Sequence, residues 1–249
     1  MDGTTAGVSE NSPVALAERL KAALGLQHEP IAIAFGSDPL PDVTAYAGAA
    51  PSAGASGRTG LVPAGCCFWA EAETATFATT AADHANCSVG SYTHGLMPLE
   101  EAATRDDTQA LLASGWVAQA DLAGTPAVGG EPRHVTYGPL RDAPFVPDVV
   151  LMRLTPQALM TLQSACPELQ LAGKPQCQII PRAREQGWLV SSLGCAVSRA
   201  RTGLPASEMT CALPAGELVA IVERLERGAQ ADELVTGFAH ADRERFASS

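Results

Sequence analysis

The chain has 249 residues, which is long enough for one large domain or two small ones. Apolar residues make up 46% and charged residues 17%, a balance typical of a globular chain. The net charge of −11, with no basic cluster, argues against a nucleic-acid partner. No apolar run approaches the ~20 residues that span a bilayer. The acidic N-terminus lacks the features of a secretory signal, so we expect a cytoplasmic protein.

The N-terminal part of the chain alternates helical and strand patterns. A helix is predicted to start at Pro13, because Ser12 can cap it and proline suits the first helical position. Gly25 is predicted to end this helix. Residues 1–12 before it are polar and are predicted to form a disordered tail. Further along we expect a strand over residues 31–35, mostly loop over 36–65, a helix over 65–72 and a strand over 76–80.

The rest of the chain continues in the same manner. Residues 83–96 read as a loop in which Gly90 and Gly95 act as hinges. Gly- and Pro-rich residues 121–146 are predicted to be a linker. We expect helices over residues 99–112, 156–166 and 217–227, strands over 149–154, 188–193 and 209–213, and a polar tail over 242–249. The helix at 156 starts at Thr155-Pro156, in the same way as the one at Ser12-Pro13.

Two stretches of the chain resemble each other. Residues 87–96 read CSVGSYTHGL and residues 195–204 read CAVSRARTGL, with Cys, Val, Gly and Leu in register. A further cysteine, Cys67 or Cys177, lies upstream of each stretch. This self-similarity predicts two pseudo-repeated lobes, residues 13–120 and 147–241, packed about a pseudo-two-fold axis. The fold class is then α/β or α+β, and each lobe is a small sheet with helices.

The cysteines are the main candidates for chemistry. Seven is an odd number, and without an export signal thiols or ligands are more probable than disulfides. If the lobes pack symmetrically, Cys67, Cys87, Cys177 and Cys195 meet at one site. Four cysteines suffice for a [4Fe–4S] cluster or an all-cysteine zinc site. No C-x-x-C pair supports this by spacing, and simple burial is the alternative for every cysteine.

The remaining cysteines have no counterpart in the repeat. Cys66 is adjacent to Cys67 and can take its place as a ligand. Cys166 and Cys211 fall in helix and strand patterns, for which a core position is the better prediction.

Two histidines, a tyrosine and two arginines accompany these cysteines. His84 and His94 bracket Cys87 and can ligate a metal or move a proton, and Tyr92 can supply a phenolic proton. Their alternative is a structural hydrogen bond within a loop. Arg199 and Arg201 follow Cys195 and can bind an anionic substrate, although pairing with surface carboxylates is the simpler alternative.

Several of these stretches together resemble the DUF169 family of prokaryotic proteins. They are GCCFWAEA at residues 65–72, DHANCSVGSYTHGL at 83–96, KPQC at 174–177 and LGCAVSRARTGL at 193–204. The resemblance covers about residues 24–225 and maps onto Cys67, His84, Cys87, His94, Cys177 and Cys195. The run from Ser198 to Arg201 departs from the Gly-Asn-Arg-like run of the family, which bears on Arg201 more than on Arg199. The resemblance implies no settled activity, but it supports the choice of the four cysteines.

These features lead to several hypotheses. The first is a cytoplasmic metalloprotein with a cysteine-ligated iron–sulfur cluster between two lobes, acting in redox or Lewis-acid chemistry on a small molecule, with an electron-transfer partner. His94, His84 and Tyr92 would then handle protons. The alternatives are a haem or mononuclear-metal enzyme with a histidine ligand, a non-catalytic metal- or ligand-binding module, and an enzyme with the Cys87 thiolate as nucleophile.

Overall fold

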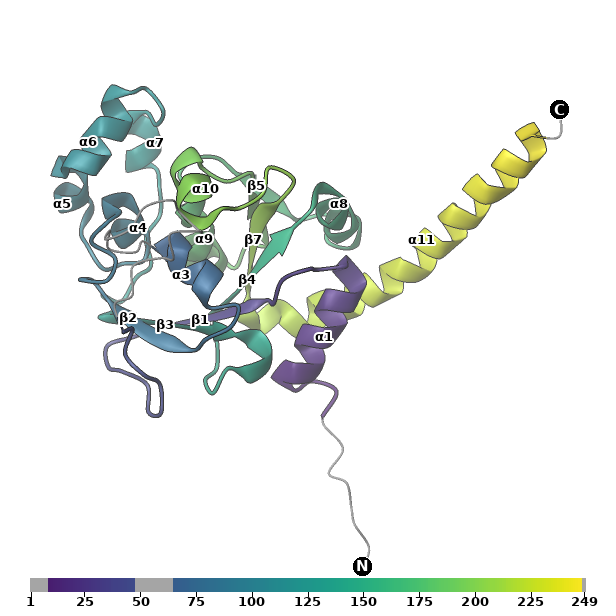
Figure 1. Cartoon of the computed structure of the whole chain (residues 1–249), viewed down its shortest axis with the longest axis horizontal. Helices are drawn as coiled ribbons and strands as arrows, with labels where there is room; N and C mark the ends of the chain where they lie inside the picture. Colours follow the sequence, from purple (N-terminus) through teal and green to yellow (C-terminus); the bar gives the residue numbers. More distant parts are fainter. Residues whose placement is uncertain (1–8, 48–64, 248–249) are drawn as a thin grey trace, which may run out of the picture.

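A single mixed sheet with helices on both faces makes up the body of the molecule (Figure 1). The structure is a computed structural model of the chain, and it describes residues 9–47 and 65–247. The seven strands lie in the order β2-β3-β1-β4-β7-β6-β5. Their bounds are β1 (Ile31–Gly36), β2 (Phe77–Thr80), β3 (His134–Pro139), β4 (Val149–Leu154), β5 (Gln170–Ala172), β6 (Val190–Ser192) and β7 (Met209–Pro214).

Helices connect these strands and cover the sheet. They are α1 (Pro13–Leu24), α3 (Gly65–Glu71), α4 (Ser88–Thr93), α5 (Leu99–Thr104), α6 (Asp106–Ala113), α7 (Gln119–Ala123), α8 (Pro156–Ala165), α9 (Ile179–Gln186), α10 (Ala196–Thr202) and α11 (Leu218–Ala247). Short 3-10 turns are η1 (Leu140–Asp142), η2 (Gln176–Gln178) and η3 (Ala215–Glu217). Within the described residues, no helix combines the length and the hydropathy that a membrane span requires.

The centre of the sheet is the antiparallel pair β1 and β4, in which Ala32 lies opposite Val150. On the outer side of β1, Ile31 pairs with Pro139 of β3. On the outer side of β4, Val149 pairs with Pro214 of β7. β2 then adds to β3 and β6 adds to β7, so the two halves of the sheet are built in the same order from the centre outward. β5 extends the second half through a parallel pairing with β6.

Alternate residues of the central strands point to opposite faces and form two cores. Val150 and Met152 pack against α1, α8 and α11. Ile33 and Leu151 pack on the other face against α3 and α9. Each such apolar side chain stabilises the fold by about 1.5–3 kcal/mol when it is fully buried. Both faces are therefore covered, and the thiol-lined cavity described below lies beside the second core.

The caps predicted for two helices are confirmed. The Ser12 hydroxyl accepts a hydrogen bond from the Ala15 amide at 3.2 Å, and Pro13 begins α1. Thr155 caps α8 in the same way, through the Ala158 amide. Gly25 ends α1 with φ of +62°, a left-handed conformation that suits glycine. These local signals are strong because the side chains satisfy backbone amides that the helix itself leaves unpaired.

The organisation into two separate small sheets is corrected. Residues 121–146, predicted as a linker, include β3, which lies between β1 and β2 in one continuous sheet. A Gly- and Pro-rich run directly before β3 obscures the alternating polar and apolar pattern that indicates a strand. Residues 88–93, predicted as loop, form α4, and the predicted helix over 99–112 is divided at Arg105 into α5 and α6. Residues 1–8 of the predicted tail and residues 48–64 of the predicted loop lie outside the described residues.

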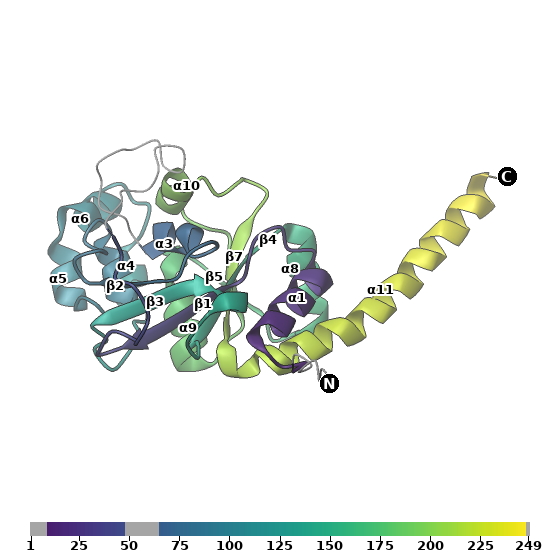
Figure 2. The same ribbon diagram turned by 60° about the horizontal axis from the view of Figure 1, so that its bottom comes forward.

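The last helix has two different surroundings along its length. Its first turns pack on the body through Leu218, Ile221, Val222 and Leu225. It then continues away from the body to Ala247, as Figures 1 and 2 both show. The predicted polar tail over 242–249 is thus helical up to residue 247.

Candidate functional site

A cavity of about 470 Å³ lies between the thiol-bearing loops of the two halves. Four cysteines from four separate segments line it: Cys66, Cys87, Cys177 and Cys195. None of the seven cysteines, all of which the structure describes, is in a disulfide. The other lining residues are mostly apolar and come largely from α6, α10 and the segment after α6, and they include Trp69, Leu111, Trp116, Val117, Leu122 and Val197.

Each of the four thiols lies at or near the start of a helix or within a 3-10 turn. Cys87 and Cys195 are the N-cap residues of α4 and α10, both in extended backbone conformation. Cys66 lies in the first turn of α3, and Cys177 lies in η2, just before α9. α3 packs against α10, and α4 packs against η2, so each contact joins one half to the other. Thiols far apart in the sequence thereby come to one cavity.

Of the two adjacent cysteines on α3, Cys66 and not Cys67 lines the cavity. Cys67 is 3% exposed and is not among the residues that line the cavity. The two side chains differ by about 100° around the helix axis, so only one of them can face α10 and the cavity. Composition and spacing do not tell which of the two adjacent cysteines faces the cavity. The rotation of α3 about its axis decides this.

Two buried histidines lie under the start of α3. A Cβ atom on Gly65 would come within 3.0 Å of Cε1 of His94 and 3.5 Å of Cε1 of His84. Glycine at this position therefore lets the helix, with Cys66, approach the imidazoles. The ring centroids of the two histidines are 5.2 Å apart.

The hydrogen bonds define the tautomers of both rings. Nδ1 of His94 lies 2.8 Å from the Gly90 carbonyl oxygen and donates to it, which leaves Nε2 with its lone pair. His84 Nε2 lies 3.0 Å from the Thr79 hydroxyl, whose own proton goes to the Val135 carbonyl, so Nε2 is the donor. Among the described residues, neither His94 Nε2 nor His84 Nδ1 has a hydrogen-bond partner. Two acceptor nitrogens are thus held buried, and His94 lines the cavity.

Burial keeps both imidazoles neutral. It lowers the pKa of His94 to about 4, and the hydrogen bond to Gly90 only partly offsets this effect. The pKa of His84 is lowered well below its ordinary value by burial and by the neighbouring His94. At neutral pH each ring can accept a proton or a metal ion, but neither carries charge.

The thiols affect one another in the same direction. The pKa of Cys66 is raised well above its ordinary value by a hydrogen bond with Cys67, by burial and by the charges of Cys67, Cys87 and Cys195 as thiolates. Burial first, and then Cys87, raises the pKa of Cys177. Without a cation, Cys66 and Cys177 are therefore held as protonated thiols.

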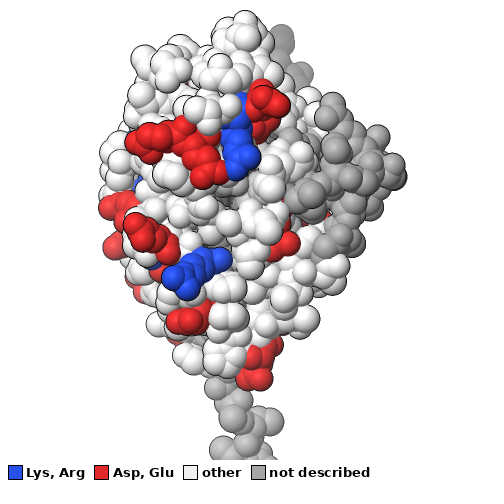
Figure 3. All heavy atoms as spheres, turned by 90° about the vertical axis from the view of Figure 1, so that its left-hand side faces the viewer, with Lys and Arg blue, Asp and Glu red and all other residues white. Residues whose placement is uncertain are grey.

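Charged groups are scarce around the cavity. Asp107 is the one charged residue among the described lining residues, and its carboxylate accepts hydrogen bonds from the Ser88 amide and hydroxyl at 2.8 and 2.7 Å. It thereby supports the start of α4 next to Cys87. The neighbouring outer face of the molecule shows acidic side chains with only a few basic ones among them (Figure 3), in keeping with the net charge of −11.

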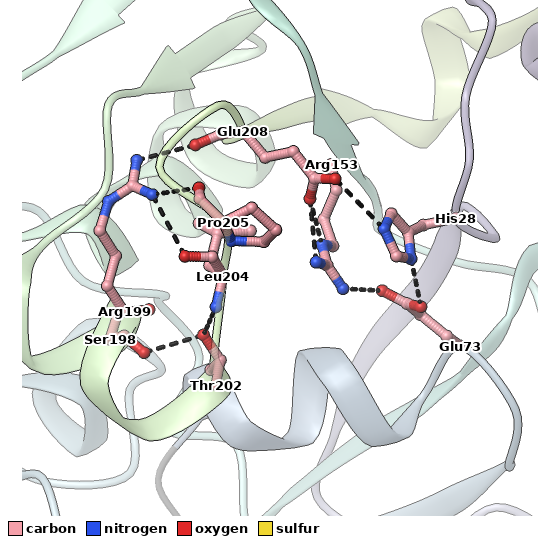
Figure 4. A network of polar contacts seen from close by, with 9 residues as sticks. All are labelled: His28, Glu73, Arg153, Ser198, Arg199, Thr202, Leu204, Pro205 and Glu208. Carbon is pink, nitrogen blue, oxygen red and sulfur yellow. Dashed lines mark hydrogen bonds and ion pairs between the residues drawn. The ribbon is translucent and has the colours of Figure 1, made fainter. Parts of the chain in front are cut away.

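Arg199 supports the loop that follows Cys195 (Figure 4). Its guanidinium donates to the carbonyl oxygens of Leu193, Pro205 and Glu208 at 2.6, 2.5 and 2.7 Å. Gln176, from the same half, holds Cys195 itself, since its Oε1 accepts from the Cys195 amide at 3.1 Å. Arg199 does not line the cavity, and the side chain of Arg201 lies outside what the structure describes.

The same loop connects to a network of ion pairs beneath it (Figure 4). Arg153 of β4 pairs with Glu73 at 2.9 Å and with Glu208 at 2.9 Å. His28 contacts both carboxylates, at 2.9 and 3.3 Å. These largely buried charges satisfy one another and join segments before β1, after α3 and before β7. They connect the end of α3, which carries Cys66, to β4 and to the segment before β7.

Tyr92 is also engaged away from the cavity. Its hydroxyl donates to the Thr125 carbonyl at 2.7 Å, and burial raises its pKa. It ties α4 to the segment after α7. Trp116 and Gln176 line the cavity but were not predicted from the sequence; the adjacency of Gln176 to Cys177 was the only available signal.

Ligand geometry at the site does not match a single ion. Among the described residues, no group of three or more His, Cys, Asp or Glu side chains is close enough to hold one metal ion. A cluster of several metal atoms spaces its thiolates further apart than a single ion does.

Comparison with known proteins identifies the family. The DUF169 model, described as "Uncharacterised ArCR", matches residues 19–224. The chain belongs to the DUF169 family. The match covers all four thiol segments of this DUF169 protein, both histidines and the whole sheet, and it ends within α11. No curated protein and no solved structure matches the chain.

Proposed function

We propose that this DUF169 protein is a metalloprotein in which Cys66, Cys87, Cys177 and Cys195 hold an iron–sulfur cluster. Four thiolates are the usual ligand set of a [4Fe–4S] cluster. The observation that carries the proposal is that four thiols from four distant segments line one cavity without forming disulfides. Bound there, such a cluster would supply electron transfer or a Lewis-acidic iron for chemistry on a small molecule.

The charge balance of the site supports a cationic occupant. Cys66 and Cys177 resist ionisation on their own, because burial and the neighbouring thiols raise their pKa. Iron replaces the protons and removes this repulsion, and a coordinating thiol is deprotonated outright.

His94 and His84 are the proton-handling groups of the proposal. The ring of His94 is neutral and lines the cavity. Its Nε2 atom carries the lone pair and has no hydrogen-bond partner among the described residues. It can therefore accept a proton from a bound substrate or return one to it. The ring centroid of His84 lies 5.2 Å from that of His94, and a hydrogen bond between its Nε2 and the Thr79 hydroxyl orients the ring. Because the Tyr92 hydroxyl donates to the Thr125 carbonyl, we infer that Tyr92 positions α4 and does not donate a proton to a substrate.

A second candidate is a haem or mononuclear-metal group with His94 as ligand. One observation favours it: His94 donates Nδ1–H to a backbone carbonyl, the arrangement that commonly orients a metal-ligating imidazole. The absorption spectrum separates the two candidates, since haem gives a sharp Soret band and an iron–sulfur cluster gives broad brown absorption.

The proposal includes the internal repeat as its structural basis. The pairs Ile31–Leu151 and Ile33–Val149 exchange when the two halves are exchanged, and a pseudo-two-fold axis then passes near Ala32 and Val150. The same exchange relates β3 to β7, β2 to β6 and α4 to α10. Under this two-fold relation, corresponding thiols of the two halves would lie together at the interface between the halves. The reduced state of the cysteines suits a cytoplasmic location, which is part of the proposal together with an electron-transfer partner.

Adjacent cysteines offer a matched test. The protein is purified anaerobically, and iron, acid-labile sulfide, zinc and the absorption spectrum are measured for the wild type, Cys66→Ser and Cys67→Ser. We expect iron and sulfide in the wild type, a loss of at least half of both in Cys66→Ser, and near-normal content in Cys67→Ser. Wild-type protein without iron, or equal iron in all three proteins, contradicts the cluster.

A further inference from the structure

One wall of the cavity is apolar and comes from a segment without cysteines. Residues 99–123, which form α5, α6, α7 and their connections, contain no cysteine. Five apolar side chains of this segment line the cavity: Ala110, Leu111, Trp116, Val117 and Leu122. Val117 is 4% exposed and Leu122 0%, so the wall is built from the packed interior of the segment.

The two halves of the molecule differ at this wall. Between α4 and β3 the chain forms α5, α6 and α7, whereas residues 203–208, all of them described, connect α10 to β7 without a helix. The wall thus belongs to one half only, although both halves contribute thiols to the cavity. A cluster held by thiols of both halves does not require such a wall, so the wall serves a second purpose.

Polar contacts fix the wall to the thiol-bearing segments. Asp107 of α6 accepts hydrogen bonds from the Ser88 amide and hydroxyl at the start of α4, at 2.8 and 2.7 Å. Nζ of Lys174, in the segment that leads to Cys177, donates to the Trp116 carbonyl at 2.5 Å and lies 4.5 Å from the centroid of the indole ring. Wall and thiols are therefore held around one preformed cavity, as in most small-molecule sites.

The charges at the cavity disfavour a charged ligand. Asp107 is the one charged residue among the described lining residues. The cations of neighbouring segments are engaged with carbonyl oxygens, Lys174 with that of Trp116 and Arg199 with three others. A carboxylate or phosphate would therefore be buried without a counter-ion, which is costly. An ammonium group would lose its water for a carboxylate that already accepts two hydrogen bonds from Ser88.

We propose that this apolar wall binds the hydrocarbon or aromatic body of an uncharged organic molecule beside the cluster. The cavity volume of about 470 Å³ lies in the usual range of small-molecule sites, ~300–1,000 Å³. Protein interiors leave few voids larger than a water molecule, so an apolar cavity of this size is a binding site and not a packing defect. That the molecule is the substrate rests on the proposed function, whereas its binding depends on the wall.

Three ligands with the same aromatic body and different charge test the class of ligand. They are 2-naphthol, which is uncharged at neutral pH, the anion 2-naphthoate and the cation 2-naphthylmethylamine. Their binding to the anaerobically purified full-length protein is measured by isothermal titration calorimetry. We expect saturable binding of naphthol and at least ten-fold weaker binding of both charged analogues. Absence of naphthol binding, or a charged analogue that binds as tightly as naphthol, overturns the proposal.

Adjacent residues of α6 test the location of the ligand. Leu111 lines the cavity and Leu112 does not, and both are half-buried. We expect Leu111→Glu to weaken naphthol binding at least ten-fold and Leu112→Glu to retain the wild-type affinity.

A second pair of variants adds volume in place of charge, at exposed positions that tolerate substitution. Ala110→Phe fills the cavity and should also weaken binding, whereas Ala113→Phe, outside the lining, should not. Equal affinities within both pairs overturn the location.

Iron and acid-labile sulfide, measured in the same samples, separate this inference from the cluster. Leu111→Glu and Ala110→Phe are expected to keep the wild-type iron content, because neither removes a thiol. Iron-containing wild type that does not bind naphthol overturns the inference and leaves the cluster. Naphthol that binds iron-free wild type, and binds Leu111→Glu at least ten-fold more weakly, supports the apolar site and contradicts the cluster.

Discussion

Cys87 and Cys195 are both helix N-cap residues, and both line the same cavity. In Cys195 the sulfur accepts a hydrogen bond from the Ser198 amide at 3.2 Å, in the manner of a serine or aspartate cap. The thiol thus has a structural partner in the chain as well as a place in the site. Substitutions at Cys195 can separate the two roles.

Serine and alanine at position 195 are expected to behave differently in the metal-free protein. Cys195→Ser retains a cap oxygen, so the free energy of unfolding should change by less than about 0.5 kcal/mol, whereas Cys195→Ala should lose about 1 kcal/mol. Both should lose iron if the sulfur is a cluster ligand. Chemical denaturation and metal analysis of both variants measure this. Retained iron in Cys195→Ser would remove this residue from the ligand set.

The buried histidines should make the metal-free protein sensitive to mild acid. The unfolded chain binds a proton at His94 near pH 6.5, but the folded protein does so only near pH 4, because burial lowers the pKa. The unfolded state therefore binds more protons between these values, and the free energy of unfolding falls as the pH drops through that window. The loss is about 3 kcal/mol for His94, on the order of its pKa shift.

Denaturation profiles at several pH values check this expectation. His94→Gln cannot titrate and should show a shallower decline between pH 6.5 and 4. His84, whose pKa is also lowered by burial, adds to the slope in both proteins. A wild-type profile that is flat over this range would mean that the imidazoles are not buried as described.

Arg199 is expected to stabilise the fold and not to bind an anion. Arg199→Ala removes hydrogen bonds to the carbonyls of Leu193, Pro205 and Glu208 and should cost about 2 kcal/mol. Arg199→Lys should restore only part of this loss, because an ammonium group cannot reproduce the planar fork. Thermal or chemical denaturation measures both effects. Unchanged stability, with weaker binding of an anionic substrate, would support the role predicted from the sequence.

Gly95 should be intolerant of even a single methyl group. Its φ is +73°, and a Cβ would lie 2.4 Å from the Val128 carbonyl oxygen. Gly95→Ala is expected to cost about 3 kcal/mol from strain and displacement of that segment. Gly115→Ala is the control, with φ of +70° but no atom within 4 Å of the added Cβ, and it should cost only about 1 kcal/mol. Similar losses in the two variants would show that the contact with Val128 is unimportant.

Sequence reasoning succeeded where the signal is local. The caps at Ser12 and Thr155 and the strands at 31–35, 149–154 and 209–213 were predicted because side-chain caps and short apolar runs act within a few residues. The family was also identified from short motifs. Prediction failed for β3 and for the division of the sheet, because strand pairing between distant segments depends on contacts that no local pattern specifies.

The sequence by itself determined which side chains this protein has for chemistry: seven cysteines, and one histidine on each side of Cys87. Only the tertiary structure decided which of them meet. The rotation of α3 brings Cys66 and not Cys67 to the cavity, burial under Gly65 makes the histidines neutral, and the carbonyls around Arg199 engage its guanidinium. The physical reason is that direction, burial and hydrogen-bond partners are set by packing between segments far apart in the chain.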